Sequence, residues 1–126
     1  MHDVNTGLPY GNSSFDVVNG RFLAGGITNY LATIREIYRV LRDTGNGWIQ
    51  LTELRPFLRC DDQSIPCDAA CISWHDSFFR GPAGSALGTA DFDSIAINLR
   101  SMVENAGFVD VREYIDKAPV GGWDSG

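Results

Sequence analysis

The sequence predicts an α/β fold organised around one parallel strand–helix–strand unit. Two short runs, Phe15–Val18 and Gly47–Leu54, have the β-branched and aromatic character of strands. Between them, apolar residues recur every three or four positions from 29 to 41, which is the spacing of an amphipathic helix. Since parallel neighbours need a crossover connection, usually a helix, we expect this unit to form the centre of the fold.

Composition limits the classes of protein to which this chain can belong. Its 126 residues suffice for one domain, and 44% hydrophobic residues allow a packed core. A net charge of −6 with only ten Lys and Arg argues against direct binding of nucleic acid. The sequence has no run of about 18 apolar residues, so no membrane span is predicted. The N-terminal residues show no secretory signal, so we expect a cytoplasmic or nuclear protein that is not secreted.

The three cysteines, Cys60, Cys67 and Cys71, lie in one region of the chain. An odd number confined to one region is typical of reduced thiols in a reducing compartment. His75 is available as a fourth zinc ligand, but Cys67 and Cys71 do not have the spacing of a zinc-ribbon pair. We therefore expect no metal site.

The first strand follows a loop-like segment, residues 1–14, that is punctuated by glycine and proline. Its apolar residues do not strictly alternate, which predicts a strand covered on both faces. Asn19, Gly20 and Arg21 interrupt the apolar run after it. Ligands bind beyond the carboxyl ends of parallel strands, so these residues either line a site or simply end the strand.

The central helix has a plausible N-cap at Thr28 or Asn29. Its apolar stripe is expected to be core, and it consists of Leu31, Ile34, Ile37, Tyr38 and Leu41. The second strand, Gly47–Leu54, alternates and is stopped by Pro56. Glu53 lies at its carboxyl end, either as a site residue or as an exposed acid.

Residues 55–90 read as an insertion that resembles a lid within a single domain of residues 1–126. A helix is predicted over Ala69–Arg80, without a clean apolar stripe. Its Trp74, His75 and two phenylalanines either cover an apolar ligand or pack down as a lid with nothing beneath it. We expect His75 to be a partly buried polar residue and not a catalytic base. A nucleophilic pair of Cys71 and His75 has no third group to support it.

The last part of the chain predicts a helix that starts near Asp91 or Asp93 and runs to Asn105. Ala106-Gly107-Phe108 is a helix stop. Val109–Ile115 then alternates, which predicts a third strand, and residues 117–126 form a tail.

Several motifs in sequence resemble a known family. They are Leu8-Pro9-Tyr10, Ser14-Phe15-Asp16-Val17-Val18, Arg35-Glu36-Ile37-Tyr38-Arg39-Val40-Leu41, Gly47-Trp48-Ile49-Gln50-Leu51-Thr52-Glu53 and Ala106-Gly107-Phe108. In this order they resemble the second half of a class I S-adenosylmethionine-dependent methyltransferase, in the fungal branch that includes regulators of secondary metabolism. The resemblance implies that the three strands are the fourth, fifth and sixth of a partial Rossmann-like sheet with flanking helices.

The resemblance also implies site residues. An acid at the position of Asp3 contacts the adenine amino group of S-adenosylmethionine in this family. Asn19, Gly20 and Arg21 would line the pocket beside the methionine moiety. The insertion, with Trp74 and His75, would lie over the methyl acceptor, which the sequence does not identify. Glu53, from its place at the carboxyl end of the second strand, is a further candidate for contact with the acceptor. No residue is assigned a catalytic role.

One departure from the family matters more than these matches. The sequence contains no Gly-x-Gly-x-x-Gly, P-loop or Gly-x-Ser-x-Gly motif. Without the glycine-rich loop the cofactor loses most of its cradle, so we expect this chain alone to bind S-adenosylmethionine weakly or not at all. It is then either an incomplete methyltransferase domain, inactive in isolation, or a non-enzymatic remnant acting as an interaction or regulatory module. We also expect self-association, or binding of a partner, through the exposed strand edge at Phe15–Val18.

Overall fold

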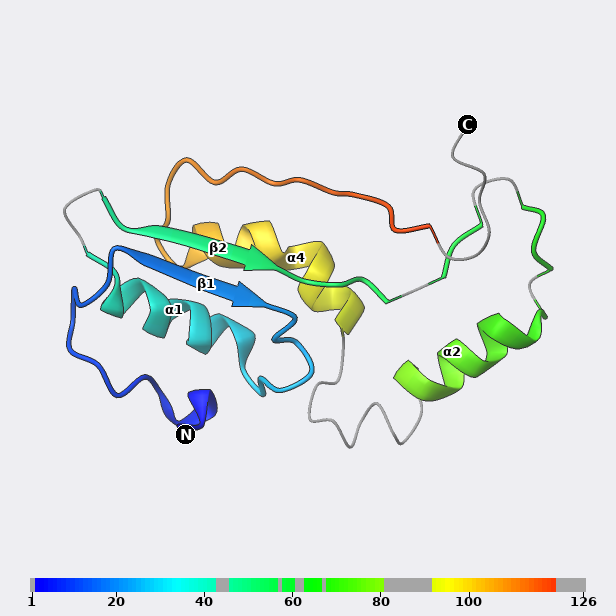
Figure 1. The fold of residues 1–126 in the computed structure, drawn as a ribbon, viewed down its shortest axis with the longest axis horizontal. Coiled ribbons are helices and arrows are strands. Elements are labelled where there is room, and N and C mark those ends of the chain that lie inside the picture. Colours follow the sequence, from blue (N-terminus) through cyan, green and yellow to red (C-terminus); the bar gives the residue numbers. More distant parts are fainter. Residues whose placement is uncertain are drawn as a thin grey trace.

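The strand–helix–strand unit is present and forms the centre of the structure (Figure 1). The structure, a computed structural model, describes residues 2–42, 46–56, 58–60, 63–66, 68–80 and 92–119. Its elements are the short 3-10 helix η1 (Val4–Thr6), β1 (Val17–Arg21), α1 (Tyr30–Val40), β2 (Trp48–Thr52), α2 (Ala70–Arg80) and α4 (Phe92–Asn105). The prediction of an α/β fold is confirmed, whereas the assignment of strands to particular positions in a methyltransferase sheet stays a prediction.

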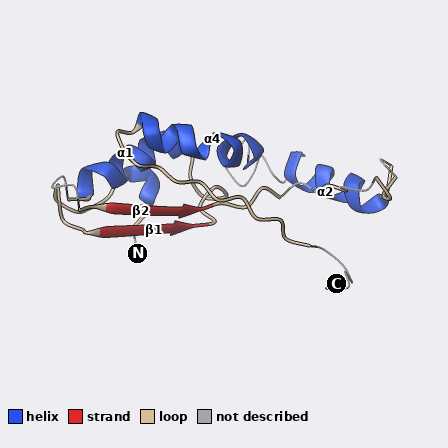
Figure 2. Cartoon of the chain, turned by 90° about the horizontal axis from the view of Figure 1, so that it is seen from above, coloured by secondary structure: helices blue, strands red, loops and turns tan. Residues whose placement is uncertain are grey.

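β1 and β2 form a parallel pair in which Val17 lies opposite Trp48 and Arg21 opposite Thr52. Helices α1 and α4 cover one face of this pair, as Figure 2 shows from above. The other face is uncovered within the described residues, so Val17 is 61% exposed and Trp48 is 69% exposed. The prediction that the first strand is covered on both faces is therefore wrong. Its side chains alternate, with Val18 and Gly20 toward the helices.

The predicted end of the first strand is also wrong. Asn19, Gly20 and Arg21 lie inside β1, and the strand begins at Val17 instead of Phe15. Gly20 fits here because the strand packs tightly: an added Cβ would lie 2.8 Å from side-chain atoms of both Leu23 and Leu51. Phe15 still joins the parallel arrangement through an isolated bridge to Leu41. A residue with low strand propensity is thus kept in the strand by its packing.

Helix α1 supplies most of the core. Asn29 caps it, because its side chain accepts a hydrogen bond from the Ala32 amide at 3.0 Å. Ile34 and Ile37 are buried as predicted, whereas Tyr38 lies at the margin with its ring edge-on to Phe108. The main core cluster joins this helix to the loop after β1 and to α4, and consists of Ala24, Ile27, Tyr30, Ile34 and Val103.

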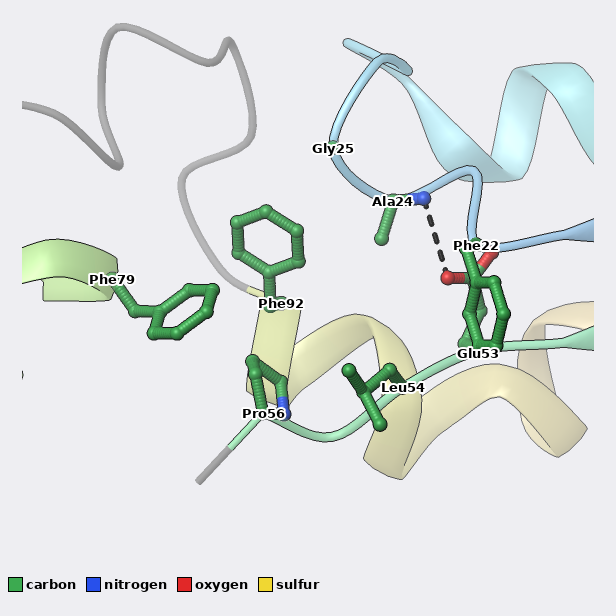
Figure 3. A pocket seen from close by; sticks show the side chains of 8 residues that line it. All are labelled: Phe22, Ala24, Gly25, Glu53, Leu54, Pro56, Phe79 and Phe92. Atoms are coloured by element: carbon green, nitrogen blue, oxygen red, sulfur yellow. Dashed lines mark hydrogen bonds between the residues drawn. The ribbon is translucent and has the colours of Figure 1, made fainter. Parts of the chain in front are cut away.

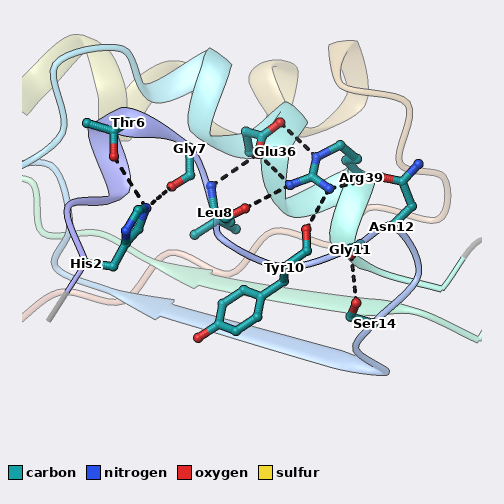
Figure 4. Close-up of polar contacts among 10 residues, drawn as sticks. All are labelled: His2, Thr6, Gly7, Leu8, Tyr10, Gly11, Asn12, Ser14, Glu36 and Arg39. Carbon is teal, nitrogen blue, oxygen red and sulfur yellow. Dashed lines mark hydrogen bonds and ion pairs between the residues drawn. The ribbon is translucent and has the colours of Figure 1, made fainter.

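The N-terminal segment is tied to α1 by one guanidinium group (Figure 4). Arg39 donates hydrogen bonds to the carbonyl oxygens of Leu8 and Tyr10 and to the side chain of Asn12. It also pairs with Glu36 at 2.8 Å, and Glu36 in turn accepts the Leu8 amide. The hydrogen bond from Arg39 is the main reason that the pKa of Glu36 is lowered, with the Leu8 amide second. Two of the motifs quoted above are therefore in direct contact.

The helix stop after α4 has the hydrogen bonds of a Schellman motif. The Gly107 amide donates to the Glu104 carbonyl at 3.0 Å, and the Phe108 amide donates to the Val103 carbonyl at 3.4 Å. Gly107 has a φ of 106°, a conformation that L side chains rarely adopt. This confirms the prediction that residues 106–108 end the helix.

The third predicted strand is not formed. Residues 109–119 run without regular secondary structure, and Val109 and Ile115 are more than 80% exposed. The alternating pattern is present, but a strand also needs a hydrogen-bonded neighbour, and among the described residues β2 does not provide one. Only Val111 of this segment packs against the core.

None of the helices in the described part of the chain is long and apolar enough to cross a membrane.

We predict that Gly107→Ala destabilises the protein by about 1–2 kcal/mol, because the alanine would be held at positive φ. Its Cβ would also lie 3.3 Å from the ring of Tyr38. Urea unfolding followed by circular dichroism measures the effect. Gly11→Ala is the matched control, since its Cβ would meet only the Ser14 hydroxyl at an ordinary 3.6 Å. Equal unfolding midpoints for the two variants would contradict the argument.

Candidate functional site

An open hollow lies at the carboxyl ends of the two strands (Figure 3). Its volume is about 120 Å³. Its walls come from four segments: Phe22, Ala24 and Gly25 after β1, Glu53, Leu54 and Pro56 after β2, Phe79 from α2, and Phe92 at the start of α4. The position is the one expected for a ligand site in a parallel sheet, and the lining is mostly apolar and aromatic.

Glu53 is the ionisable residue in this lining, and its carboxylate is turned toward the loop after β1 (Figure 3). It accepts hydrogen bonds from the Leu23 amide at 2.9 Å, the Ala24 amide at 3.3 Å and the Tyr30 hydroxyl at 2.5 Å. The end of β2 thereby holds the loop that follows β1. This geometry gives Glu53 a positioning role and leaves its predicted contact with a substrate as a prediction.

Tyr30 is held in its neutral form by this contact. The pKa of its hydroxyl is raised well above the ordinary value, first by burial and then by the hydrogen bond and the negative charge of Glu53. A tyrosine that stays neutral and donates to a carboxylate stabilises the loop and does not act as a base.

Phe22 adds a strained wall to the hollow. Its φ of 53° places a bulky residue in the left-handed region, which usually favours glycine or asparagine. Phe22 is 61% exposed, and the Arg21 guanidinium lies 5.9 Å from the centroid of its ring. The chain therefore presents an aromatic ring to solvent at the exact turn where the strand ends, at a conformational cost of about 1–2 kcal/mol.

The residues predicted to line a cofactor pocket after β1 do not converge on this hollow. Asn19 and Arg21 lie on the uncovered face of the sheet, where Asn19 donates to the Gln50 side chain at 3.2 Å. Gly20 is buried on the opposite face, between Leu23 and Leu51. Because the strand runs through them, these three residues are divided between two faces of the sheet.

Asp3 caps the short helix η1. Its side chain accepts from the amide and the side chain of Asn5, both at 3.0 Å. Asn5 then reaches the loop after β1, donating to the Gly26 carbonyl at 2.9 Å and accepting from the Thr28 amide. Asp3 thus stands beside the carboxyl-end loop of the sheet, and its predicted contact with an adenine stays a prediction.

Trp74 and His75 lie on α2, which stands beyond the strand ends in both views (Figures 1 and 2). Trp74 is 65% exposed and does not line the hollow. His75 is buried beside Phe79, with ring centroids 4.6 Å apart. Phe79 is the residue of α2 that lines the hollow, and its ring centroid lies 5.6 Å from that of Phe92.

Sequence reasoning missed Phe22 and Phe92 and gave Phe79 no individual weight. The available signal was position: Phe22 comes directly after the first strand, and Phe92 opens a helix. No pattern along the chain indicated that these two residues and Phe79, more than 50 positions from Phe22, contribute to one wall.

The described residues give no support to a cysteine-based or metal-binding site. The Cys60 sulfur accepts from the Ile65 amide at 3.3 Å, Cys71 is exposed, and Cys67 lies outside the described residues. Within the described ranges, no group of three or more His, Cys, Asp or Glu side chains is arranged to hold a metal ion.

We predict that Glu53→Ala lowers the free energy of unfolding by about 3 kcal/mol, because it leaves two loop amides and the buried Tyr30 hydroxyl without their acceptor. Glu53→Gln retains one acceptor oxygen and should cost about 1 kcal/mol. Asp116→Ala, which removes an exposed acid elsewhere, is the control and should change stability by less than about 0.5 kcal/mol. Urea denaturation at neutral pH measures all three, and equal losses for Glu53→Ala and Asp116→Ala would refute the positioning role.

Comparison with known proteins gives matches along most of the chain. It is 29% identical over 115 residues to the secondary metabolism regulator LAE1 of Cochliobolus heterostrophus, a match that covers 90% of this chain and 35% of that protein. It is 27% identical over 109 residues to the methyltransferase pytC of Aspergillus terreus, covering 86% of this chain and 32% of that protein. It is 28% identical to the secondary metabolism regulator laeA of Fusarium oxysporum f. sp. lycopersici, covering 34% of its length.

No protein-family model and no solved structure matches the chain. The chain spans about a third of the length of the curated relatives it matches. The resemblance drawn from the motifs is confirmed by these relatives: the chain is related to part of the fungal methyltransferases and to the secondary-metabolism regulators that resemble them.

Proposed function

We propose that this chain is part of an S-adenosylmethionine-dependent methyltransferase domain. The observation that carries the proposal is the similarity to named methyltransferases over 86% of the chain. The parallel strand–helix–strand unit with a hollow at its carboxyl ends supports it, because ligands of open parallel sheets bind at that edge. Methyl transfer requires mainly that donor and acceptor be held in line, so the lack of an assigned base does not count against it.

The described residues do not fit the whole cofactor. S-adenosylmethionine supplies an activated methyl group, but it combines an adenosine and an amino acid, and sites for ligands of that size occupy about 300–1,000 Å³. The hollow measures about 120 Å³. Asp3, the proposed adenine contact, spends one carboxylate oxygen on the cap of η1. The domain would therefore need additional chain to complete its cofactor site.

We predict that the isolated 126-residue chain binds S-adenosylmethionine weakly or not at all in isothermal titration, because the hollow that the described residues form is too small to hold the whole cofactor. Titration of Asp3→Ala under the same conditions is the matched control. If the chain bound with low-micromolar affinity the prediction would fail. Loss of that affinity in Asp3→Ala would then support the predicted adenine contact.

A second candidate function is an interaction module, and the open edge of the sheet favours it. In a parallel sheet, every second residue of a strand directs its backbone N–H and C=O groups to the strand on one side. The residues between them direct these groups to the other side. The Trp48 amide donates to the Asp16 carbonyl, and the Phe22 amide donates to the Thr52 carbonyl. It follows that Val17, Asn19 and Arg21 direct their backbone groups away from β2, to an edge that no other described strand covers. Such an edge is a template for another strand.

For this second function we predict that the chain self-associates through the outer edge of β1, and that Asn19→Pro reduces the association. Proline removes an outward amide without removing a bond to β2. Light scattering after size exclusion measures the mass over a range of concentrations, and circular dichroism checks that the variant stays folded. Trp48→Ser, on the uncovered face, separates pairing at the edge from stacking of faces. A monomer at high concentration would overturn the proposal.

A further inference from the structure

We propose that the hollow at the strand ends binds a single aromatic ring of an uncharged ligand. That this group belongs to the methyl acceptor rests on the function proposed above. Binding of the ring itself does not rest on that function, because it depends only on the residues that line the hollow in this chain.

The chemistry of the walls selects apolar groups. Phe22, Phe79 and Phe92 contribute aromatic rings, and Leu54 and Pro56 contribute aliphatic surface. Phe79 and Phe92 are packed edge to face at 5.6 Å, an arrangement that a further ring extends favourably (Figure 3). These rings come from the loop after β1, from α2 and from α4, so the hollow exists only when distant segments of the chain are assembled.

The size of the hollow limits the ligand to one ring. Its volume is about 120 Å³. A dry apolar cavity of about 150 Å³ accommodates benzene in another protein. Because the hollow is also open on one side, a ring can enter while the rest of a larger molecule remains outside.

The negative charge of Glu53 selects against ligands that carry an acid group. Glu53 lines the hollow, and its carboxylate is already occupied by two loop amides and by Tyr30. Its hydrogen bonds fix its position and its negative charge remains at the wall, where it disfavours a ligand that carries a carboxylate. A neutral ring should therefore bind better than the same ring bearing an acid group.

Gly25 offers a way to close the hollow without removing any of its walls. An added Cβ at this position would point toward Phe92, 3.6 Å from its ring, and the backbone is not in the left-handed region. A valine side chain would extend from there into the space. Trp74 is the matched control, since it lies on the same helix as Phe79 but is exposed and does not line the hollow.

The test is a titration of the 126-residue chain with benzyl alcohol, followed by amide chemical shifts in two-dimensional NMR. We expect saturable shifts at Ala24, Gly25 and Leu54, with a dissociation constant on the order of 1 mM. Gly25→Val should weaken binding at least tenfold, Trp74→Ala should leave it unchanged, and benzoate should bind at least tenfold more weakly than benzyl alcohol.

Three results would overturn the proposal: shifts that do not saturate, wild-type affinity in Gly25→Val, or equal affinity for benzoate. If Gly25→Val does not fold, Phe79→Ala decides the question, because loss of that ring should weaken binding and unchanged affinity would refute the site. Saturable ring binding combined with no methyl transfer in any completed form of the domain would reject the proposed function and keep the binding site. The reverse result would keep the function and reject this site.

Discussion

The region at the carboxyl ends of the two strands depends on the hydrogen bonds that the carboxylate of Glu53 accepts. This carboxylate is placed at the end of β2 by the parallel register and reaches across to the loop that follows β1. Through the Tyr30 hydroxyl it also fixes the first turn of α1. One side chain thus joins both strand ends and the crossover helix. A half-buried carboxylate with three donors is strongly favoured over one left without them, so the loop has one conformation that satisfies it. The shape of the hollow follows from that conformation.

The central unit could be predicted because its signals are local. The spacing of apolar residues in 29–41 identifies the helix, and Asn29 supplies its cap. The end of β1 could not be predicted because Gly20 has low strand propensity, and its place in the strand depends on pairing with Leu51 of β2 and on tight packing against Leu23 and Leu51. The third strand failed for a related reason. Alternation in Val109–Ile115 describes a segment able to pair, and pairing requires a neighbour that alternation does not reveal.

The sequence predicted the position of the candidate site, at the carboxyl ends of the strands, but not the residues that line it. Glu53 was correctly located at a carboxyl end, and the structure adds that it faces the loop. The aromatic wall could not be read from the chain, because its members come from segments with no common spacing. The family resemblance implied that Trp74 lies over the methyl acceptor, but α2 presents Phe79 to the hollow and leaves Trp74 65% exposed. Helical periodicity without a clean stripe does not decide between these two faces.

The attachment of the N-terminal segment to α1 also determines how that segment responds to acid. Arg39 remains charged at every accessible pH, and its acceptors at Tyr10 and Asn12 are neutral oxygens that do not titrate. The Leu8 amide is held instead by Glu36, whose lowered pKa keeps the carboxylate ionised to a pH below its ordinary value. As the pH falls through that lowered pKa, the stabilisation contributed by Glu36 is lost while the contacts at Tyr10 and Asn12 persist. Acidification therefore weakens the hold on the Leu8 amide alone, while the carbonyl oxygens of Leu8 and Tyr10 and the side chain of Asn12 stay bonded to Arg39.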